Sequence, residues 1–365
     1  MHTFFMTGYP GFLAQRLLRQ LLNDHGTHID HIYLLVLPSL EGQATQDIHY
    51  FAKKHSLNPG MFSILPGDIT QPDLGLNREH TAHLIQTVTH VFHLAAIYDL
   101  AVPETLAWNV NVEGTRHVNN WVQTISSLKR YVYVSTAYVS GRREGDIYEH
   151  ELSCGQTFKN HYERTKFEAE RQVDHLKSVI PLTIIRPGIV KGHAETGETI
   201  KFDGLYFMLN FLDSIRHLPV LPYLGDGKAE GNFVPADYVL KATSFLSMAD
   251  IGVGKTYHLT DPNPYKMRDI YKLLAYYYLG RTPSGHMPLP MAKIGLSFSL
   301  MRKYTGTEQE ALDYFTTEAR FDCSQAQKDL QKSDITCPDL VDTIPSMVSF
   351  YRRYKDDYAR QINII

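Results

Sequence analysis

"TFFMTGYPGFLAQRLLRQLL" (residues 3–22) passes from a short apolar run through a glycine-containing turn into an amphipathic stretch. This order predicts a strand, a tight turn and a helix. In the pattern T-G-x-x-G-x-x-A, Gly8 permits the turn, Gly11 lets a pyrophosphate approach the backbone, and Ala14 keeps helix and strand close. The free N–H groups of the helix N-terminus favour an anion. The segment therefore predicts a dinucleotide-binding turn, with cofactor contacts from Thr7, Gly8, Tyr9, Pro10, Gly11, Phe12 and Leu13.

Five more β-rich runs follow, separated by helical stretches, at residues 31–37, 61–68, 90–96, 130–136 and 182–188. Apolar strands that alternate with amphipathic helices indicate a parallel sheet covered on both faces. The fold class we predict is α/β, a doubly wound parallel (Rossmann) sheet with a smaller, mostly helical C-terminal substrate cap. We expect residues 1–191, completed by 231–262, to form the dinucleotide-binding domain. Residues 192–230 and 263–365 are predicted to form the cap.

The composition excludes some classes of function. The 365 residues include 36 Lys and Arg and 39 Asp and Glu, which gives a formal charge of -3. Without an excess of basic residues, a nucleic-acid partner is not expected. Three separated cysteines predict free thiols and a cytoplasmic location. No signal peptide or transmembrane run is expected. "PMAKIGLSFSLM" (290–301) leaves two interpretations open, packing on the protein's own core or peripheral contact with a lipid surface.

Parallel sheets bind ligands at the carboxyl ends of their strands. After the third strand, Asp68 is a candidate acceptor for an adenine amino group, although a capping role is an equal alternative. The second strand ends in Leu37 and Ser39, without the acid typical of NAD sites or the arginine typical of NADP sites. Ser39, or the later lysines at 53 and 54, would then meet a 2'-phosphate, so NADP(H) is preferred and NAD(H) is not excluded. The remaining predicted cofactor contacts at strand ends are Ile69, Ala95, Ala96, Pro187, Gly188 and Ile189.

Four residues are predicted to carry the chemistry. A hydride added to a carbonyl leaves an alkoxide, which needs hydrogen-bond donors and an acid; Thr136 and Tyr162 supply both. Lys166 follows Tyr162 at i+4, on the same helix face, where an ammonium would stabilise the phenolate and contact the cofactor with it. Asn111 is a candidate to hold a water that links this lysine to solvent. Taken singly, the Tyr/Lys pair also fits a solvated helix surface, and Asn111 also fits a structural role.

Taken together, these motifs resemble the extended short-chain dehydrogenase/reductase superfamily. The resemblance rests on T-G-x-x-G-x-x-A from Thr7, "GD" at 67–68, N-x-x-G-T from Asn111, "ST" at 135–136 and Y-x-x-x-K from Tyr162. Segments such as "VSTAYVSGRREGDIYEHEL", "FKNHYERTKFEAE" and "GNFVPADYV" are similar to the branch of fatty acyl-CoA reductases, male-sterility proteins and thioester reductase domains. The resemblance implies a Rossmann domain in which Thr136, Tyr162 and Lys166 are catalytic and Asn111 is auxiliary.

The leading hypothesis is an NAD(P)H-dependent oxidoreductase that reduces a hydrophobic acyl thioester, aldehyde or ketone. The apolar, methionine-bearing stretch 287–301 favours a greasy substrate. A carrier protein remains open as the source of the thioester, and no metal site is predicted. The alternatives are a nucleotide-sugar epimerase or dehydratase, a sterol-type hydroxyl dehydrogenase, and a noncatalytic cofactor-sensing protein.

Overall fold

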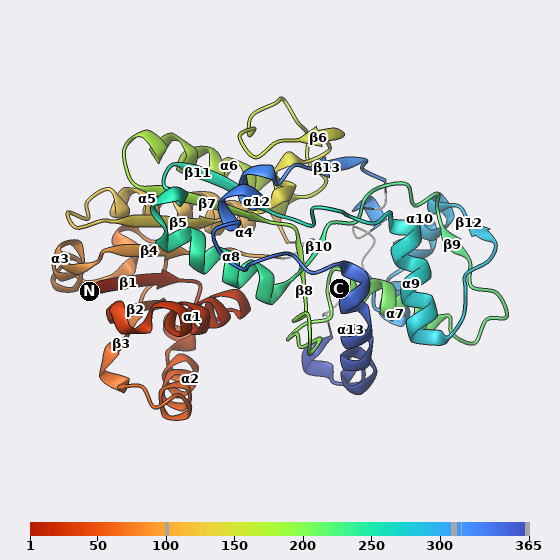
Figure 1. Cartoon of the computed structure of the whole chain (residues 1–365), viewed down its shortest axis with the longest axis horizontal. Coiled ribbons are helices and arrows are strands. Elements are labelled where there is room, and N and C mark those ends of the chain that lie inside the picture. Colours follow the sequence, from red (N-terminus) through yellow and green to blue (C-terminus); the bar gives the residue numbers. More distant parts are fainter. Residues whose placement is uncertain (99–101, 308–311, 315, 362–365) are drawn as a thin grey trace.

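A seven-stranded, wholly parallel sheet forms the centre of the molecule, in the order β11-β7-β5-β4-β1-β2-β3 (Figure 1). The computed structural model describes residues 1–98, 102–307, 312–314 and 316–361. The strands are β1 His2–Thr7, β2 Ile29–Val36, β3 Phe62–Pro66, β4 His90–His93, β5 Arg130–Val134, β7 Leu182–Pro187 and β11 Lys255–Leu259. The six strands predicted from sequence are confirmed, and the doubly wound α/β class with them.

Helices cover both faces of this sheet. Helices α1 (Phe12–His25), α2 (Glu41–Lys54) and α8 (Ala236–Met248) share one apolar core with the sheet. Helices α3 (Arg78–Thr87), α5 (Gly114–Val122) and α6 (His161–Asp174) share the core of the other face. Between β4 and α5 the chain forms the short helix α4 (Glu104–Ala107) and a π-helical turn, Trp108–Glu113.

Alternation along β1 shows why the strands are apolar throughout. Phe4 and Met6 pack into the core beneath α1 and α8, whereas Phe5 points to the opposite face, where its ring lies 4.4 Å from that of Trp121. Successive side chains of a strand point to opposite faces of the sheet. A sheet covered on both faces therefore needs apolar residues at odd and even positions alike.

A separate apolar core lies beyond the carboxyl ends of the strands, at the right of Figure 1. It is built by α7 (Tyr206–Ser214), α9 (Met267–Leu279) and α13 (Leu340–Tyr354), with α10 (Leu289–Ser297) and α11 (Ser299–Thr305) beside it. Three two-stranded pairs complete the fold: β8 Ile189–Lys191 with β10 Phe233–Pro235, β9 Tyr223–Leu224 with β12 His286–Met287, and β6 Gly145–Ile147 with β13 Ala319–Phe321.

One late segment returns to the sheet. Helix α12 (Ser324–Leu330) places Ala326 and Leu330 in the core of α1 and α8, although the sequence pattern predicts that the range 263–365 belongs to the cap. Residues 308–311, 315 and 362–365 of that range lie outside the described residues. The three cysteines are free thiols. Within the described ranges, no helix combines the length and apolar character needed to cross a bilayer.

Candidate functional site

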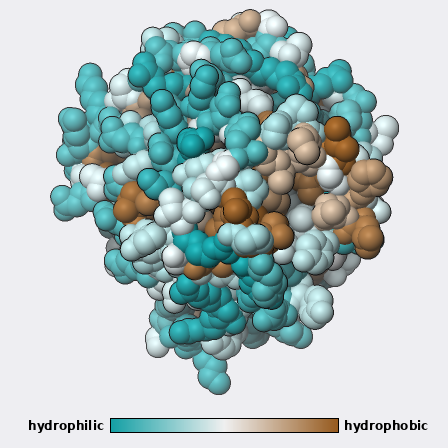
Figure 2. Space-filling model, turned by 90° about the vertical axis from the view of Figure 1, so that its right-hand side faces the viewer, coloured by the Kyte–Doolittle hydropathy of each residue, from teal (hydrophilic) through white to brown (hydrophobic). Residues whose placement is uncertain are grey.

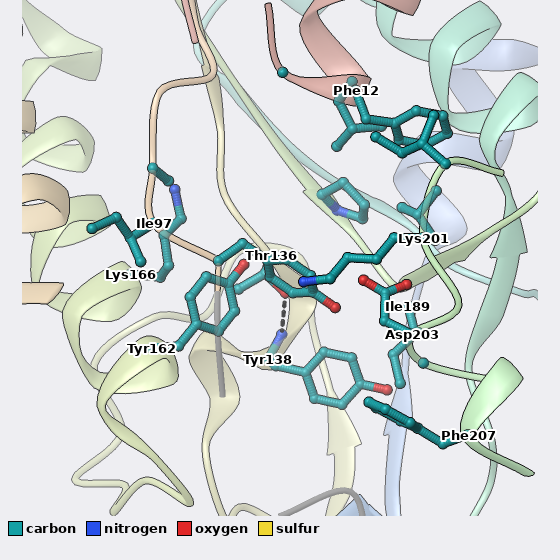
Figure 3. Close-up of a pocket in the computed structure, with 18 of the residues that line it drawn as sticks. Phe12, Ile97, Thr136, Tyr138, Tyr162, Lys166, Ile189, Lys201, Asp203 and Phe207 are labelled. Atoms are coloured by element: carbon teal, nitrogen blue, oxygen red, sulfur yellow. Dashed lines mark hydrogen bonds between the residues drawn. The ribbon is translucent and has the colours of Figure 1, made fainter. Parts of the chain in front are cut away.

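A single cavity of about 1120 Å³ joins the carboxyl ends of the central strands to the cap. Its sheet side is lined by the turn after β1 and by the ends of β4, β5 and β7. Its far side is lined by α7, α10 and α11. Figure 3 shows Thr136 and Tyr162 on the sheet side and Lys201, Asp203 and Phe207 across the cavity from them.

The turn after β1 brings backbone N–H groups to this cavity. Gly8 has a φ of 87°, and a Cβ there would lie 2.8 Å from the backbone nitrogen of Ala95. Gly11 N–H bonds to Gly8 O at 2.8 Å, and Gly11 then caps α1 without a side-chain acceptor. All seven predicted contacts from Thr7 to Leu13 line the cavity. Free N–H groups and space at two glycines fit a dinucleotide pyrophosphate.

A buried hydrogen-bonded chain fixes the end of β1, and sequence reasoning missed it. Thr7 Oγ1 accepts from Ala95 N at 3.1 Å and is hydrogen-bonded to His93 Nδ1 at 2.8 Å. The other ring nitrogen, Nε2, is hydrogen-bonded to Thr115 Oγ1 at 3.1 Å. Burial lowers the pKa of His93 to about 3, which favours the neutral ring. No motif pointed to His93, because its two partners, Thr7 and Thr115, come from segments far from it in the chain.

The other predicted cofactor contacts divide into two groups. The cavity is lined by Asp68, Ile69, Ala95, Ala96, Pro187, Gly188 and Ile189. Asp68 Oδ1 already accepts from Thr70 N at 2.8 Å, which leaves its second carboxylate oxygen for a ligand. In the described structure, Ser39, Lys53 and Lys54 are exposed and do not line the cavity, whereas Leu37 does.

Thr136 and Tyr162 meet in the middle of the cavity. Thr136 follows β5 and caps the 3-10 turn Ala137–Ser140, its Oγ1 accepting from Tyr138 N at 3.3 Å (Figure 3). Tyr162 lies in the first turn of α6, whose cap Asn160 accepts from Glu163 N at 2.9 Å. Burial raises the pKa of Tyr162 above its ordinary value, and hydrogen bonding with Thr136 opposes this rise.

Lys166 also lines the cavity, one helical turn after Tyr162, but its amine is held by β5. Nζ donates to Tyr133 Oη and to Val134 O, both at 2.9 Å. The side chain is 3% exposed, and burial lowers its pKa to about 7, with Glu170 acting in the opposite direction. The structure therefore holds a lysine that changes protonation state near neutral pH at the base of the site.

Asn111 lies behind this site, outside the lining of the cavity. Its Oδ1 accepts from Ile97 N at 2.8 Å, and its Nδ2 donates to Ile97 O at 3.2 Å and Thr165 Oγ1 at 3.0 Å. The amide thus ties the segment after β4 to α6. Both N–H groups of the Asn111 amide and one lone pair of its oxygen are therefore occupied by bonds within the protein.

A buried ion pair between Arg186 and Glu170 joins β7 to α6. Arg186 donates to Glu170 Oε1 through Nε at 2.8 Å and Nη2 at 2.6 Å. Ser135 Oγ donates to the other oxygen of Glu170. Because Ser135 precedes Thr136, and Glu170 lies one turn after Lys166, this pair fixes strand and helix relative to one another.

The cap side of the cavity is mostly apolar, with a few hydroxyl side chains and two charged residues, Lys201 and Asp203. Five of the ten methionines of the chain line it, namely Met208, Met267, Met287, Met291 and Met301. Lys201 and Asp203 also line it, and burial raises the pKa of Asp203 to about 6, with Lys201 opposing the rise. Sequence reasoning singled out the 287–301 stretch but not this pair. The described residues contain no group of His, Cys, Asp or Glu arranged to hold a metal.

The chain is similar in sequence and in fold to known proteins. The family model described as male sterility protein matches residues 6–243, more than half of the chain. Over 272 residues the chain is 27% identical to "Fatty acyl-CoA reductase wat" of Drosophila melanogaster, covering 65% of this chain and 52% of that protein. It is 27% identical over 274 residues to "Aldehyde reductase lnbA" of Aspergillus flavus, covering 71% of this chain and 26% of that protein. The chain thus spans about half the length of the first and about a quarter of the second.

Among solved structures, the terminal R domain from the myxalamid PKS-NRPS biosynthetic pathway superposes with a TM-score of 0.82 at 25% identity. The match covers 99% of this chain and 93% of that one. A thiolation-reductase di-domain from an archaeal non-ribosomal peptide synthetase shares the fold, with a TM-score of 0.72 at 18% identity over 97% of this chain and 76% of that one.

Proposed function

Because the chain belongs to the male sterility protein family, we propose that it is an NAD(P)H-dependent reductase of a hydrophobic acyl thioester, with the corresponding aldehyde as product. The observation that carries the proposal is the single cavity that runs from the α1 N-terminus, past Thr136 and Tyr162, to a methionine-lined end. A dinucleotide and an apolar acyl chain would share this space, since the volume exceeds what one drug-sized ligand fills. Methionine adapts to flexible apolar chains.

The proposed chemistry uses three side chains. Bound NAD(P)H supplies the hydride to the thioester carbon. Thr136 and Tyr162 donate hydrogen bonds to the carbonyl oxygen, and Tyr162 gives it a proton, which yields a hemithioacetal. Tyr162 then takes the hydroxyl proton back as the C–S bond breaks, and the thiolate leaves with the bonding electrons and is protonated by solvent. The positive charge of Lys166 stabilises the Tyr162 phenolate, which can then take up a proton again.

Arg186, Glu170 and Asn111 act in this proposal as positioning residues, since none of them lines the cavity. The cofactor site is assigned to the turn from Thr7 to Leu13, with Asp68 toward the adenine end. We propose NADPH as the preferred reductant, and the assay below compares it with NADH. We also propose that residues 1–191 and 231–262 bind the cofactor and that residues 192–230 and 263–365 bind the acyl chain, with α7, α10 and α11 on the acyl side of the cavity.

The apolar far end argues against a sugar nucleotide, whose diphosphate and hydroxyls need polar partners. The meeting of Thr136 and Tyr162 in one cavity argues against a purely cofactor-sensing role. A carrier protein is retained as one source of the thioester.

The test follows the absorbance of NADPH or NADH with a long-chain acyl-CoA, the same acyl group on a carrier protein, the matching aldehyde, a sterol and a sugar nucleotide. Oxidation by either thioester is expected. Tyr162→Phe should abolish turnover while cofactor fluorescence titration shows unchanged binding. Tyr276→Phe is the control, because Tyr276 is 59% exposed on α9 and does not line the cavity. Turnover that survives in Tyr162→Phe contradicts the mechanism.

A further inference from the structure

Helices α10 and α11 expose an unusual concentration of large apolar side chains. Figure 2 faces the cap end and shows apolar side chains gathered on one part of it. We call this group the tip surface. Its side chains are between 45% and 81% exposed, and they are Met291, Ile294, Phe298, Leu300, Met301 and Tyr304. Scattered apolar residues on a surface are ordinary, but a contiguous group of this size marks an interaction site.

The backbone that carries the tip surface is anchored. Arg302 Nη1 donates to Leu296 O at 3.1 Å and to Ser297 O at 3.0 Å, which joins the two helices where Phe298 separates them. Lys293 pairs with Asp313 at 2.5 Å. Lys293 and Arg302 are thus bonded within the protein, while Phe298 and Leu300 are exposed.

The segment that carries the tip surface is basic in sequence, although Asp313, which lies beside it in space, pairs with Lys293. Between Asp269 and Glu308 the sequence contains no acidic residue, but it contains Lys272, Arg281, Lys293, Arg302 and Lys303. Lys303 is exposed on α11, between Met301 and Tyr304 of the tip surface. A stretch that combines protruding apolar side chains with an excess of cations is complementary to an apolar layer with an anionic face.

The tip surface is continuous with the cavity. Met291, Met301 and Tyr304 belong to the tip surface and also line the cavity that contains Thr136 and Tyr162. An apolar molecule that crosses this wall would pass from the layer that covers the tip surface to the methionine-lined end of the cavity. The covering layer would therefore be a reservoir of apolar ligand.

We propose that the tip surface docks on an anionic lipid bilayer, with Phe298 and Leu300 entering the region between headgroups and acyl chains and Lys303 facing lipid phosphates. A bilayer fits better than a folded protein partner because these side chains protrude rather than line a groove. The docked chain takes up its apolar ligand directly from the bilayer. Docking itself does not depend on the proposed reductase activity.

The experiment is flotation of the full chain with vesicles of phosphatidylcholine alone or of equal parts phosphatidylcholine and phosphatidylglycerol. Binding to the anionic vesicles is expected. The double variant Phe298→Asp, Leu300→Asp should lower the partition coefficient by roughly tenfold or more. Lys303→Glu should weaken binding to the anionic vesicles specifically. Tyr50→Asp on α2 is the matched control, since Tyr50 is 66% exposed on the opposite part of the fold, and it should bind like the wild type.

Circular dichroism checks that each variant is folded. The proposal is overturned if the wild type floats with neither vesicle, or if the double variant floats as well as Tyr50→Asp does. It is also overturned if vesicles leave the amide hydrogen exchange of residues 289–305 unchanged while an acyl carrier protein slows it, because the tip surface would then be a protein-docking site. Flotation requires no turnover, so a negative result leaves the proposed reductase activity to its own assay.

Discussion

Replacement of Lys166 by methionine should make the protein less sensitive to pH between 7 and 9. Lys166 is 3% exposed, and burial lowers its pKa from 10.5 to about 7. Between these two values the unfolded chain holds a proton that the folded chain has released, so the free energy of unfolding rises with pH across this window. Below pH 7 the folded protein must also carry the buried ammonium, and this contribution to stability is then absent. Methionine has no proton to exchange and a similar length.

The magnitude follows from the same pKa values. Each unit of pKa difference is worth about 1.4 kcal/mol. From pH 7, where half of the folded Lys166 is charged, to pH 9, where almost none is, the wild type should gain about 2 kcal/mol relative to Lys166→Met. Loss of the hydrogen bonds from Nζ to Tyr133 and Val134 also destabilises the variant, but this cost is present at both pH values and cancels from the comparison.

The assay is urea unfolding of both proteins at pH 7 and pH 9 without cofactor. At each pH, the unfolding free energy of Lys166→Met is subtracted from that of the wild type. The contributions of the other titrating groups cancel in this subtraction, and the prediction concerns how the result changes from pH 7 to pH 9. Lys303→Met is the control, because this lysine is exposed in the folded protein. An unfolding difference between wild type and Lys166→Met that is the same at both pH values refutes the reasoning about burial.

Three further predictions concern the cofactor turn, the cofactor preference and the buried ion pair. Gly8→Ala should weaken NAD(P)H binding by roughly tenfold or more in a fluorescence titration, because a Cβ at φ 87° would press on Ala95 N from 2.8 Å; unchanged affinity contradicts this. Leu37→Arg should favour NADPH over NADH by about tenfold in KM, since Leu37 lines the cavity at the end of β2; an unaltered ratio would place the 2'-phosphate elsewhere. Arg186→Met should lower the free energy of unfolding by about 3–5 kcal/mol, measured in urea, because Glu170 would stay buried without its cation; a loss below 1 kcal/mol, roughly, contradicts the structural role.

Much of the fold could be predicted because it depends on local chemistry. Apolar runs of strand length specified β1, β2, β3, β4, β5 and β7, and the turn from Thr7 to Ala14 placed a helix N-terminus at the end of β1. The i+4 spacing of Tyr162 and Lys166 needed only a helix to put both on one face. The boundaries of the cap were harder to predict, because α12 packs on α8 and β11 through contacts between residues far apart in the chain.

What the sequence by itself determined was the doubly wound sheet and the residue types at its strand ends, since period, turn chemistry and helix spacing act over a few neighbouring residues. Only the tertiary structure decided what those residues touch. Lys166 bonds to β5, His93 joins Thr7 to Thr115, and Asn111 turns inward to Ile97, each through partners from separate segments. The cavity itself, and the tip surface that borders it, exist because α7, α10 and α11 fold back over the strand ends. Burial and enclosure depend on the whole chain, so no local pattern encodes them.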